Sequence, residues 1–243
     1  NKRARGCFAS KKPIAAVAAV AAGATTVINE PTNSEWINLP IFSRNTFVAD
    51  ITGLAIPMIY EYRNTGKIAV IDIILNHRKC LLQHKRFIHF ANFNNVCDVL
   101  KLANLYLHFC SGYKSKFVEL SMEDYDWLKL DVIEELIARL RRHISTTNTE
   151  YEVRIGDYRV DAIDNENNTL WEIKCKRRIT DQDVAQLHKY AHADNFKRKY
   201  KLINLLTEEI ISLNIDNGCS MLEDSCGISS GDNRDRDLQI SES

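Results

Sequence analysis

The sequence has no pair of cysteines at C-x-x-C spacing, although it contains seven cysteines. An odd number of scattered cysteines argues against a disulfide framework, and their spacing argues against a zinc ribbon. Free, buried thiols are the simpler interpretation of each one. This cysteine usage indicates a reducing, intracellular compartment.

Long apolar runs are also missing. The nearest candidate, residues 14–24, is an Ala/Val run preceded by basic residues, which superficially resembles a signal-peptide core. It is too short to span a membrane, so we expect no membrane partner. Because alanine dominates it, we interpret residues 1–35 as a low-complexity segment. The first residue is Asn1 rather than methionine, which indicates a fragment or a processed chain.

The chain carries no net charge, because 32 Lys and Arg balance 32 Asp and Glu. With 243 residues, of which 45% are hydrophobic, it can bury a sizeable core in one or two domains. After residue 215, large apolar side chains almost disappear and Asp, Ser, Gly and Asn accumulate. We therefore expect residues 216–243 to form a disordered acidic tail.

Residues 36–120 mix short apolar runs, such as 56–62 and 68–75, with Gly, Pro and Asn breaks. We interpret this region as α/β with several strands, and its role is open. Apolar residues at helical spacing predict a helix over 95–109. A basic patch interleaved with two phenylalanines suits nucleic acid, because bases stack on rings; an ordinary amphipathic segment explains it equally well. The patch comprises Arg78, Lys79, His84, Lys85, Arg86, Phe87, His89 and Phe90.

Three segments of alternating apolar and polar residues follow a predicted helix over about 123–143, which Ser121 and Asp124 would open as a capping box. The alternating segments are 151–155, 158–163 and 169–175. A Gly-Asp pair and an Asp/Asn-rich turn separate them, which is hairpin and turn chemistry. The pattern predicts three antiparallel strands in a meander.

The lengths of the two turns predict the register of this meander. If Gly156 and Asp157 form a two-residue loop, Glu152 lies opposite Asp161. If residues 165–168 form a four-residue loop, Glu172 also lies opposite Asp161. Directly opposite residues have Cβ atoms about 5 Å apart, so a row of three carboxylates on one face is costly unless a cation lies among them. Glu152 is therefore a candidate metal ligand.

Residues 172–174 form an acid-x-lysine triplet, which alone is common in proteins. A predicted helix over 179–195 follows it, with Thr180 as N-cap and with Gln186 and Tyr190 on one face. The order of hairpin, acid, strand, triplet and helix is informative as a whole. It predicts a metal-dependent phosphodiester nuclease.

These residues resemble the PD-(D/E)xK nuclease superfamily and its RecB-like branch. The resemblance covers about residues 150–206 and is carried by the stretches GDYRVDAID, LWEIKCK and QLHKY. It implies an α/β fold with a restriction-endonuclease-like core over 121–215, composed of a helix, a three-stranded antiparallel meander, a helix and a parallel strand. The region 36–120 would be an N-terminal α/β extension.

The resemblance also implies roles for individual residues. Asp161 and Glu172 would hold Mg²⁺ or Mn²⁺, with the backbone carbonyl of Ile173 as a further ligand. Lys174 would orient and activate the attacking water. The pair on the next helix, Gln186 and Tyr190, would help to position the site and the DNA.

The sequence departs from the family pattern in places. Val160 replaces the proline of the motif. Some members have an upstream histidine ligand, for which His143 lies too close to the hairpin, and others use a glutamate of the preceding helix, for which Glu134 and Glu135 are candidates. The cysteines do not have the spacing of the iron–sulfur members.

Residues 174–201 contain nine Lys or Arg against three Asp, a net charge of +6. Next to the candidate site, this run indicates a phosphate-facing surface. Residues 200–207 then predict a buried strand, which a right-handed crossover places parallel to a meander strand.

We therefore expect a Mg²⁺-dependent deoxyribonuclease that acts in replication, recombination or repair, as an exonuclease or an endonuclease. Its partners would be DNA and a larger protein such as a helicase. Two alternatives stay open: a nucleic-acid-binding module with an inactive site, and a resolvase, restriction-type or RNA-directed enzyme of the same superfamily. The intact acids and lysine argue against the first, and Gln186 and Tyr190 against the second.

Overall fold

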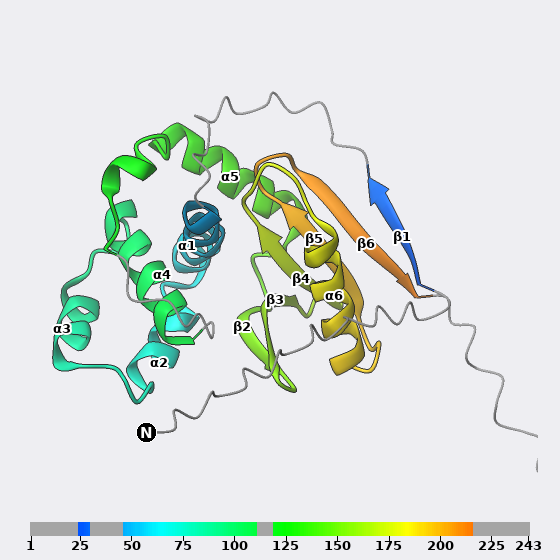
Figure 1. The fold of residues 1–243 in the computed structure, drawn as a ribbon, viewed down its shortest axis with the longest axis horizontal. Helices are drawn as coiled ribbons and strands as arrows, with labels where there is room; N and C mark the ends of the chain where they lie inside the picture. The colour runs from blue at the N-terminus through cyan, green and yellow to red at the C-terminus, as the bar shows by residue number, and fades with distance from the viewer. Residues whose placement is uncertain (1–23, 30–45, 111–118, 216–243) are drawn as a thin grey trace, which may run out of the picture. The chain divides into compact units, whose positions relative to one another are not determined.

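A mixed β-sheet forms the centre of the fold, with strand order β1-β6-β5-β4-β3-β2 (Figure 1). The computed structural model describes residues 24–29, 46–110 and 119–215. Residues 25–215 form one compact unit. The strands are β1 (Ala24–Asn29), β2 (Thr149–Ile155), β3 (Tyr158–Asp164), β4 (Thr169–Lys174), β5 (Lys199–Asn204) and β6 (Glu209–Ile215). The helices are α1 (Thr46–Thr65), α2 (Ala69–Leu75), α3 (Leu82–Phe90), α4 (Val96–Cys110), α5 (Leu130–His143) and α6 (Asp181–Ala193).

The predicted meander is confirmed, together with its register. In the hairpin of β2 and β3, Ile155 pairs with Tyr158 across the Gly-Asp turn. In the next hairpin, Asp164 pairs with Thr169 across the four-residue turn. The first turn suits its sequence because Gly156 has φ 57°, a conformation in which glycine carries no Cβ penalty.

The strand predicted beyond the second helix is also confirmed. β5 pairs with β4 in parallel, with Glu172 opposite Leu202 and Lys174 opposite Asn204. α6 makes the crossover, and it begins at the expected N-cap, Thr180, whose N–H and hydroxyl both donate to Asp183. The sequence reading missed β6, which pairs antiparallel with β5.

Helices cover both faces of the sheet (Figure 1). α1 contacts β4, α2 contacts β2, and α1 packs against both α4 and α5. On the other face, α6 contacts β3, β5 and β6. Two hydrophobic clusters correspond to these faces: Trp171 and Ile173 belong to the cluster of α1, α4 and α5, whereas Leu170 and Leu202 belong to the cluster of α6.

The expectation of several strands in the N-terminal region is wrong for its described part, because residues 46–110 form helices joined by turns. The runs 56–62 and 68–75 lie largely in α1 and α2. α1 is buried on most sides, and its Ile51, Ile56 and Tyr60 have no exposed surface. A helix buried nearly all round reads as a continuous apolar run, which periodicity cannot distinguish from a buried strand.

Two helix predictions have different outcomes. The helix expected over 95–109 is confirmed as α4. The helix expected over 123–143 is shorter, because residues 122–125 form a separate 3₁₀ turn and α5 begins only at Leu130. Ser121 precedes that turn without a side-chain capping bond, so the predicted capping box is absent.

The remaining domain limits stay predictions. The segments 1–35 and 216–243 lie outside the described residues, apart from β1. None of the helices within the described ranges is both long and apolar enough to cross a membrane.

Candidate active site

Asp161 lies where β3 and β4 separate. The pairing of these strands ends at Ala162 and Trp171. Beyond that pair, the N–H of Ile173 donates to Asp161 Oδ2 over 2.6 Å. A side-chain carboxylate thus takes the place of a backbone carbonyl, which fixes it between the two strands.

Four of the other predicted residues form a chain of contacts on the α6 face. Glu172 Oε1 accepts a hydrogen bond from Lys174 Nζ. The same ammonium lies 3.2 Å from Gln186 Oε1, and Gln186 Nε2 donates to the hydroxyl of Tyr190. Helical spacing brings Gln186 and Tyr190 together, and strand alternation puts Glu172 and Lys174 on one face, as predicted.

The electrostatics of this cluster follow from burial and like charge. Burial raises the pKa of Asp161 well above its usual value, and the neighbouring Glu172 and Glu152 raise it further. For Lys174, burial alone would lower the pKa, but Glu172 and Asp161 raise it, so the ammonium stays charged. Burial and the same two carboxylates raise the pKa of Tyr190, which keeps its proton.

Glu152 occupies the predicted register but not the predicted face. The pairs on both sides of it, including Tyr151 with Ala162 and Val153 with Val160, keep the expected register. Yet Tyr151 packs with the α1 cluster and Val153 with the α6 cluster. Strand side chains two residues apart normally share a face, so β2 switches faces at Glu152.

The backbone gives the physical reason for this switch. Glu152 has φ 54°, a left-handed conformation that is uncommon outside glycine. β3 switches at the same level, since Val160 packs with the α6 cluster and Ala162 with the α1 cluster. The predicted row of three carboxylates on a single face is therefore wrong. Asp161 lies at the point where the strands switch faces. Glu152 contacts Tyr106 of α4, whereas Glu172 lies on the face that α6 covers.

Two residues that the sequence reading missed join the site from the N-terminal helices. The hydroxyl of Tyr106, in α4, donates to Glu152 Oε2. Glu61, in α1, lines the same pocket as Glu152 and Asp161. Burial raises the pKa of Glu61 to about 7, although the N–H of Ala69 donates to its Oε1 over 2.8 Å. Neither residue belongs to the matching motif, and only the folded chain brings them there.

α1 approaches the end of β4 closely at a glycine. A Cβ added to Gly53 would lie 3.6 Å from the backbone N of Cys175 and 3.9 Å from the carbonyl oxygen of Ile173. Pro57 lies one turn later in α1 and also lines the pocket. Proline has no N–H to donate to the carbonyl four residues earlier, here that of Gly53. Gly53 and Pro57 therefore determine the surface that α1 presents to the pocket.

The glutamates expected from the preceding helix lie elsewhere. Glu134 forms an exposed ion pair with Arg63. Glu135 pairs with Arg139 and also contacts Arg142. These contacts engage both carboxylates, so the expectation that one of them joins the site is wrong. The glutamate that lines the pocket of Asp161 from a helix is instead Glu61 of α1.

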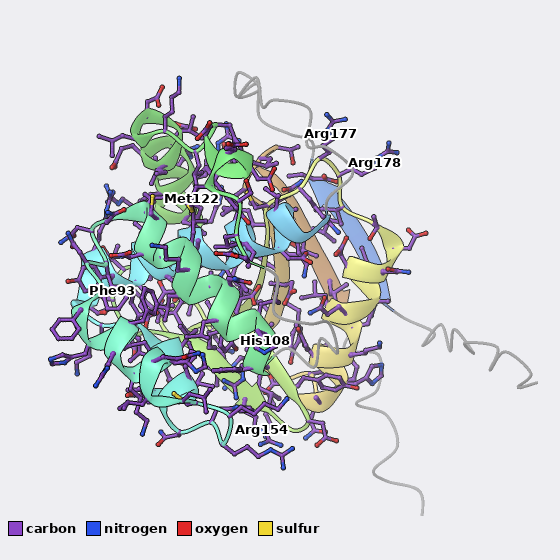
Figure 2. All side chains as sticks on the ribbon, turned by 60° about the vertical axis from the view of Figure 1, so that its left-hand side comes forward. Phe93, His108, Met122, Arg154, Arg177 and Arg178 are labelled. Atoms are coloured by element: carbon purple, nitrogen blue, oxygen red, sulfur yellow. The ribbon has the colours of Figure 1, made fainter. Side chains whose placement is uncertain are left out.

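The basic run is partly neutralised by its own surroundings. Lys176 pairs with Asp183, and Arg198 pairs with Asp194. Lys201 lies over the ring of Trp171, 5.4 Å from its centroid. Two other cations, Arg177 and Arg178, project outward from the loop between β4 and α6 (Figure 2).

The carboxylate oxygens of the site suit a small, hard cation that binds through only one or two carboxylates. No group of three or more His, Cys, Asp or Glu within the described ranges has an arrangement suited to a metal ion. Mg²⁺, however, keeps several waters and is commonly bound through one or two carboxylates. Glu172 Oε2 is buried and has no hydrogen-bond partner among the described residues, which costs free energy unless a ligand satisfies it. Asp161 and Glu172 thus fit such an ion.

Comparison of the chain with protein-family models, with curated proteins and with solved structures finds no match. The resemblance to the PD-(D/E)xK superfamily therefore depends on the motif residues and on the contacts described above.

Proposed function

We propose that this chain is a metal-dependent DNA nuclease of the RecB-like PD-(D/E)xK type, with a restriction-endonuclease-like core over residues 121–215. The observation that carries the proposal is one connected cluster. Asp161 is held where two strands separate. Glu172 accepts a hydrogen bond from Lys174, and further hydrogen bonds link Lys174 to Gln186 and Gln186 to Tyr190. A structural role alone does not require two buried acids and a lysine at this point.

The site would work as follows. Asp161 and Glu172 would hold Mg²⁺ or Mn²⁺, with Glu152 and the Ile173 carbonyl as further candidate donors. The bound cation would supply a water of lowered pKa and neutralise charge on the phosphate. Lys174, kept charged by the two acids, would place a preorganised positive charge beside the nucleophile.

Gln186 and Tyr190 position the lysine. The amide of Gln186 accepts from Lys174 at one end and donates to Tyr190 at the other. Because Tyr190 is buried and stays protonated, this end of the chain of contacts is fixed. The outward-facing Arg177 and Arg178 would contact phosphates near the site.

A second candidate function is a nucleic-acid-binding module without catalysis. The observation that favours it is the absence of a three-ligand acidic cluster from the described residues. Against it, clustered carboxylates beside phosphates would weaken binding through like charge. Partnership with a helicase or another replication, recombination or repair protein belongs to the first proposal.

Cleavage of a substrate panel tests the proposal. Labelled single-stranded, blunt duplex, branched and closed circular DNA would be incubated with Mg²⁺, Mn²⁺ or EDTA. We expect metal-dependent cleavage that Asp161→Asn abolishes and that the exposed hairpin control Asp157→Asn retains. Closed circles distinguish the modes, because an exonuclease spares them. Binding without cleavage of any substrate by folded protein would favour the binding module.

A further inference from the structure

α3 carries an outward surface that combines positive charge with exposed apolar side chains. Only Ile88 is buried in this helix. Phe90 is 80% exposed and Leu82 is 65% exposed. Helical spacing gathers these side chains with the cations on one side of α3. We call the following residues the α3 surface: Leu82, Lys85, Arg86, His89 and Phe90.

Among the described residues, the cations of this surface have no acidic partners. Between Asp72 and Asp98 the sequence contains no Asp or Glu. Within the part of the chain that the structure describes, Lys85 and Arg86 form no ion pair, in contrast to Lys176 and Arg198, which pair with carboxylates. Unpaired cations in a chain of zero net charge leave a local positive potential, which attracts phosphates.

The surface is held in place from beneath. His84 and His77 both contact the ring of Phe109 in α4, with centroids 5.1 and 5.3 Å apart. After α3, Phe93 packs edge-on against Tyr62 of α1, with ring centroids 5.7 Å apart. These anchors fix both ends of the helix while Phe90 stays exposed, so its exposure is a property of the folded chain.

A hollow beside this surface is connected to the candidate active site through α2, whose two ends line the two cavities. Its volume is about 420 Å³, and it is lined by Leu75, Lys85, Arg86, Ile88 and His89. Ligand pockets of roughly 300–1,000 Å³ hold small molecules. Leu75 ends α2, and Val70, near the start of α2, lines the pocket of Asp161 and Glu152. At 1.5 Å per residue the two positions are about 8 Å apart along the helix.

We infer that the α3 surface binds single-stranded nucleic acid, with phosphates on Lys85, Arg86 and His89 and a base stacked on Phe90, and leads the strand toward the Asp161 pocket. Single strands expose base faces, which stack on aromatic side chains beside a basic groove. A duplex hides those faces, and an acidic protein partner would not require the exposed ring. The inference rests on the proposed nuclease function for the direction of the strand.

Binding in EDTA tests the surface separately from catalysis. Fluorescence anisotropy of a short labelled oligo-dT would be measured across a range of salt concentrations. We expect Phe90→Ala to weaken binding by at least about fivefold, as loss of one stacked base does. Lys85→Gln/Arg86→Gln should lower the slope of log affinity against log salt by about 1.4, because each single-strand phosphate contact contributes about 0.7.

Matched controls come from α5 and its N-cap residue, Lys129; the first residue of α5, Leu130, is 68% exposed. Leu130→Ala removes an exposed apolar side chain, and Lys129→Gln/Arg141→Gln removes two exposed charges. Both controls should bind as the wild type does. If the Phe90 and Lys85/Arg86 variants bind the oligonucleotide as tightly as the wild type does, the inference is overturned. It is also overturned if the folded wild type binds no single strand, a result that would point to a protein partner.

Cleavage with Mg²⁺, measured on the same variants, keeps the two proposals distinguishable. Binding that depends on the α3 surface without any cleavage would support the surface and reject the nuclease. Metal-dependent cleavage, together with unchanged binding by the α3-surface variants, would reject only the proposed role of the α3 surface.

Discussion

Replacement of Lys174 by methionine should destabilise the metal-free protein strongly. The side chain of Glu172 is only 2% exposed, and its partner Lys174 is 22% exposed. Removing one member of a buried ion pair leaves an uncompensated charge and costs roughly 3–5 kcal/mol. Because the lysine is partly exposed, we expect about 3 kcal/mol in Lys174→Met.

Lys176→Met is the matched control. Its pair with Asp183 has similar exposure, 28% and 9%. Asp183, however, also accepts from the N–H and hydroxyl of Thr180, whereas Glu172 Oε2 has no such partner among the described residues. The control should therefore lose only about 1 kcal/mol.

Urea unfolding in EDTA, followed by circular dichroism, measures both costs. The cost of Lys174→Met should shrink in acid, because protonated carboxyls no longer need the ammonium. A second substitution, Glu172→Gln, should recover most of the loss. Equal costs for the two lysine variants, or a cost independent of pH, would refute the assignment of Lys174 as the counter-ion of buried acids.

Three further predictions concern the residues that α1 and α4 supply. Burial raises the pKa of Glu61 from 4.5 to about 7, so its contribution to stability is fully present below pH 4.5 and is lost as pH rises through 7. Glu61→Gln in EDTA should remove this loss, which is worth up to roughly 3 kcal/mol. Identical pH profiles of unfolding for the variant and the wild type would contradict the prediction. Tyr106→Phe removes a hydrogen bond that lowers the pKa of Glu152, so the pH profile of cleavage should move upward by about one unit or more; an unmoved profile would leave Tyr106 a packing role. Gly53→Ala meets only ordinary van der Waals contacts and should raise stability by up to about 1 kcal/mol with activity retained, whereas Gly53→Val should push α1 from β4 and lower activity; equal cleavage rates would show that this approach does not matter.

The core of the site could be predicted because turn lengths and periodicity are local. A two-residue turn at Gly156 and a four-residue turn before Thr169 were enough to place Asp161 between Glu152 and Glu172. The spacing of Gln186 and Tyr190 likewise depends on one helix. Each of these inferences uses only neighbouring residues. The strand register and the Gln186–Tyr190 pair agree with the structure, whereas the predicted face of Glu152 does not.

The face switch at Glu152 could not be predicted in the same way. A positive φ at a glutamate is a strained backbone conformation that the surrounding fold imposes, and no residue in the strand sequence predicts it. The alternation of Tyr151, Val153 and Ile155 therefore suggested a regular strand. The structure instead divides these side chains between two clusters.

Long-range contributions were also beyond the sequence. Tyr106 is 46 residues from Glu152 in the sequence, and it lies in a helix that carries no part of the matching motif. Glu61 lies in the apolar run 56–62 of a region for which the sequence predicts an α/β structure with several strands, because α1 is buried on most sides. The acids predicted from α5, by contrast, had suitable positions in the sequence but are engaged with arginines.

Cleavage of linear labelled DNA by Lys174→Ala, beside wild type and Lys176→Ala, tests the central claim most directly. The reactions would contain Mg²⁺, Mn²⁺ or EDTA, with folding of each protein checked first. The account predicts metal-dependent cleavage by wild type and Lys176→Ala, and none by Lys174→Ala or in EDTA. Equal cleavage by Lys174→Ala, or no cleavage by folded wild type with either metal, would contradict it.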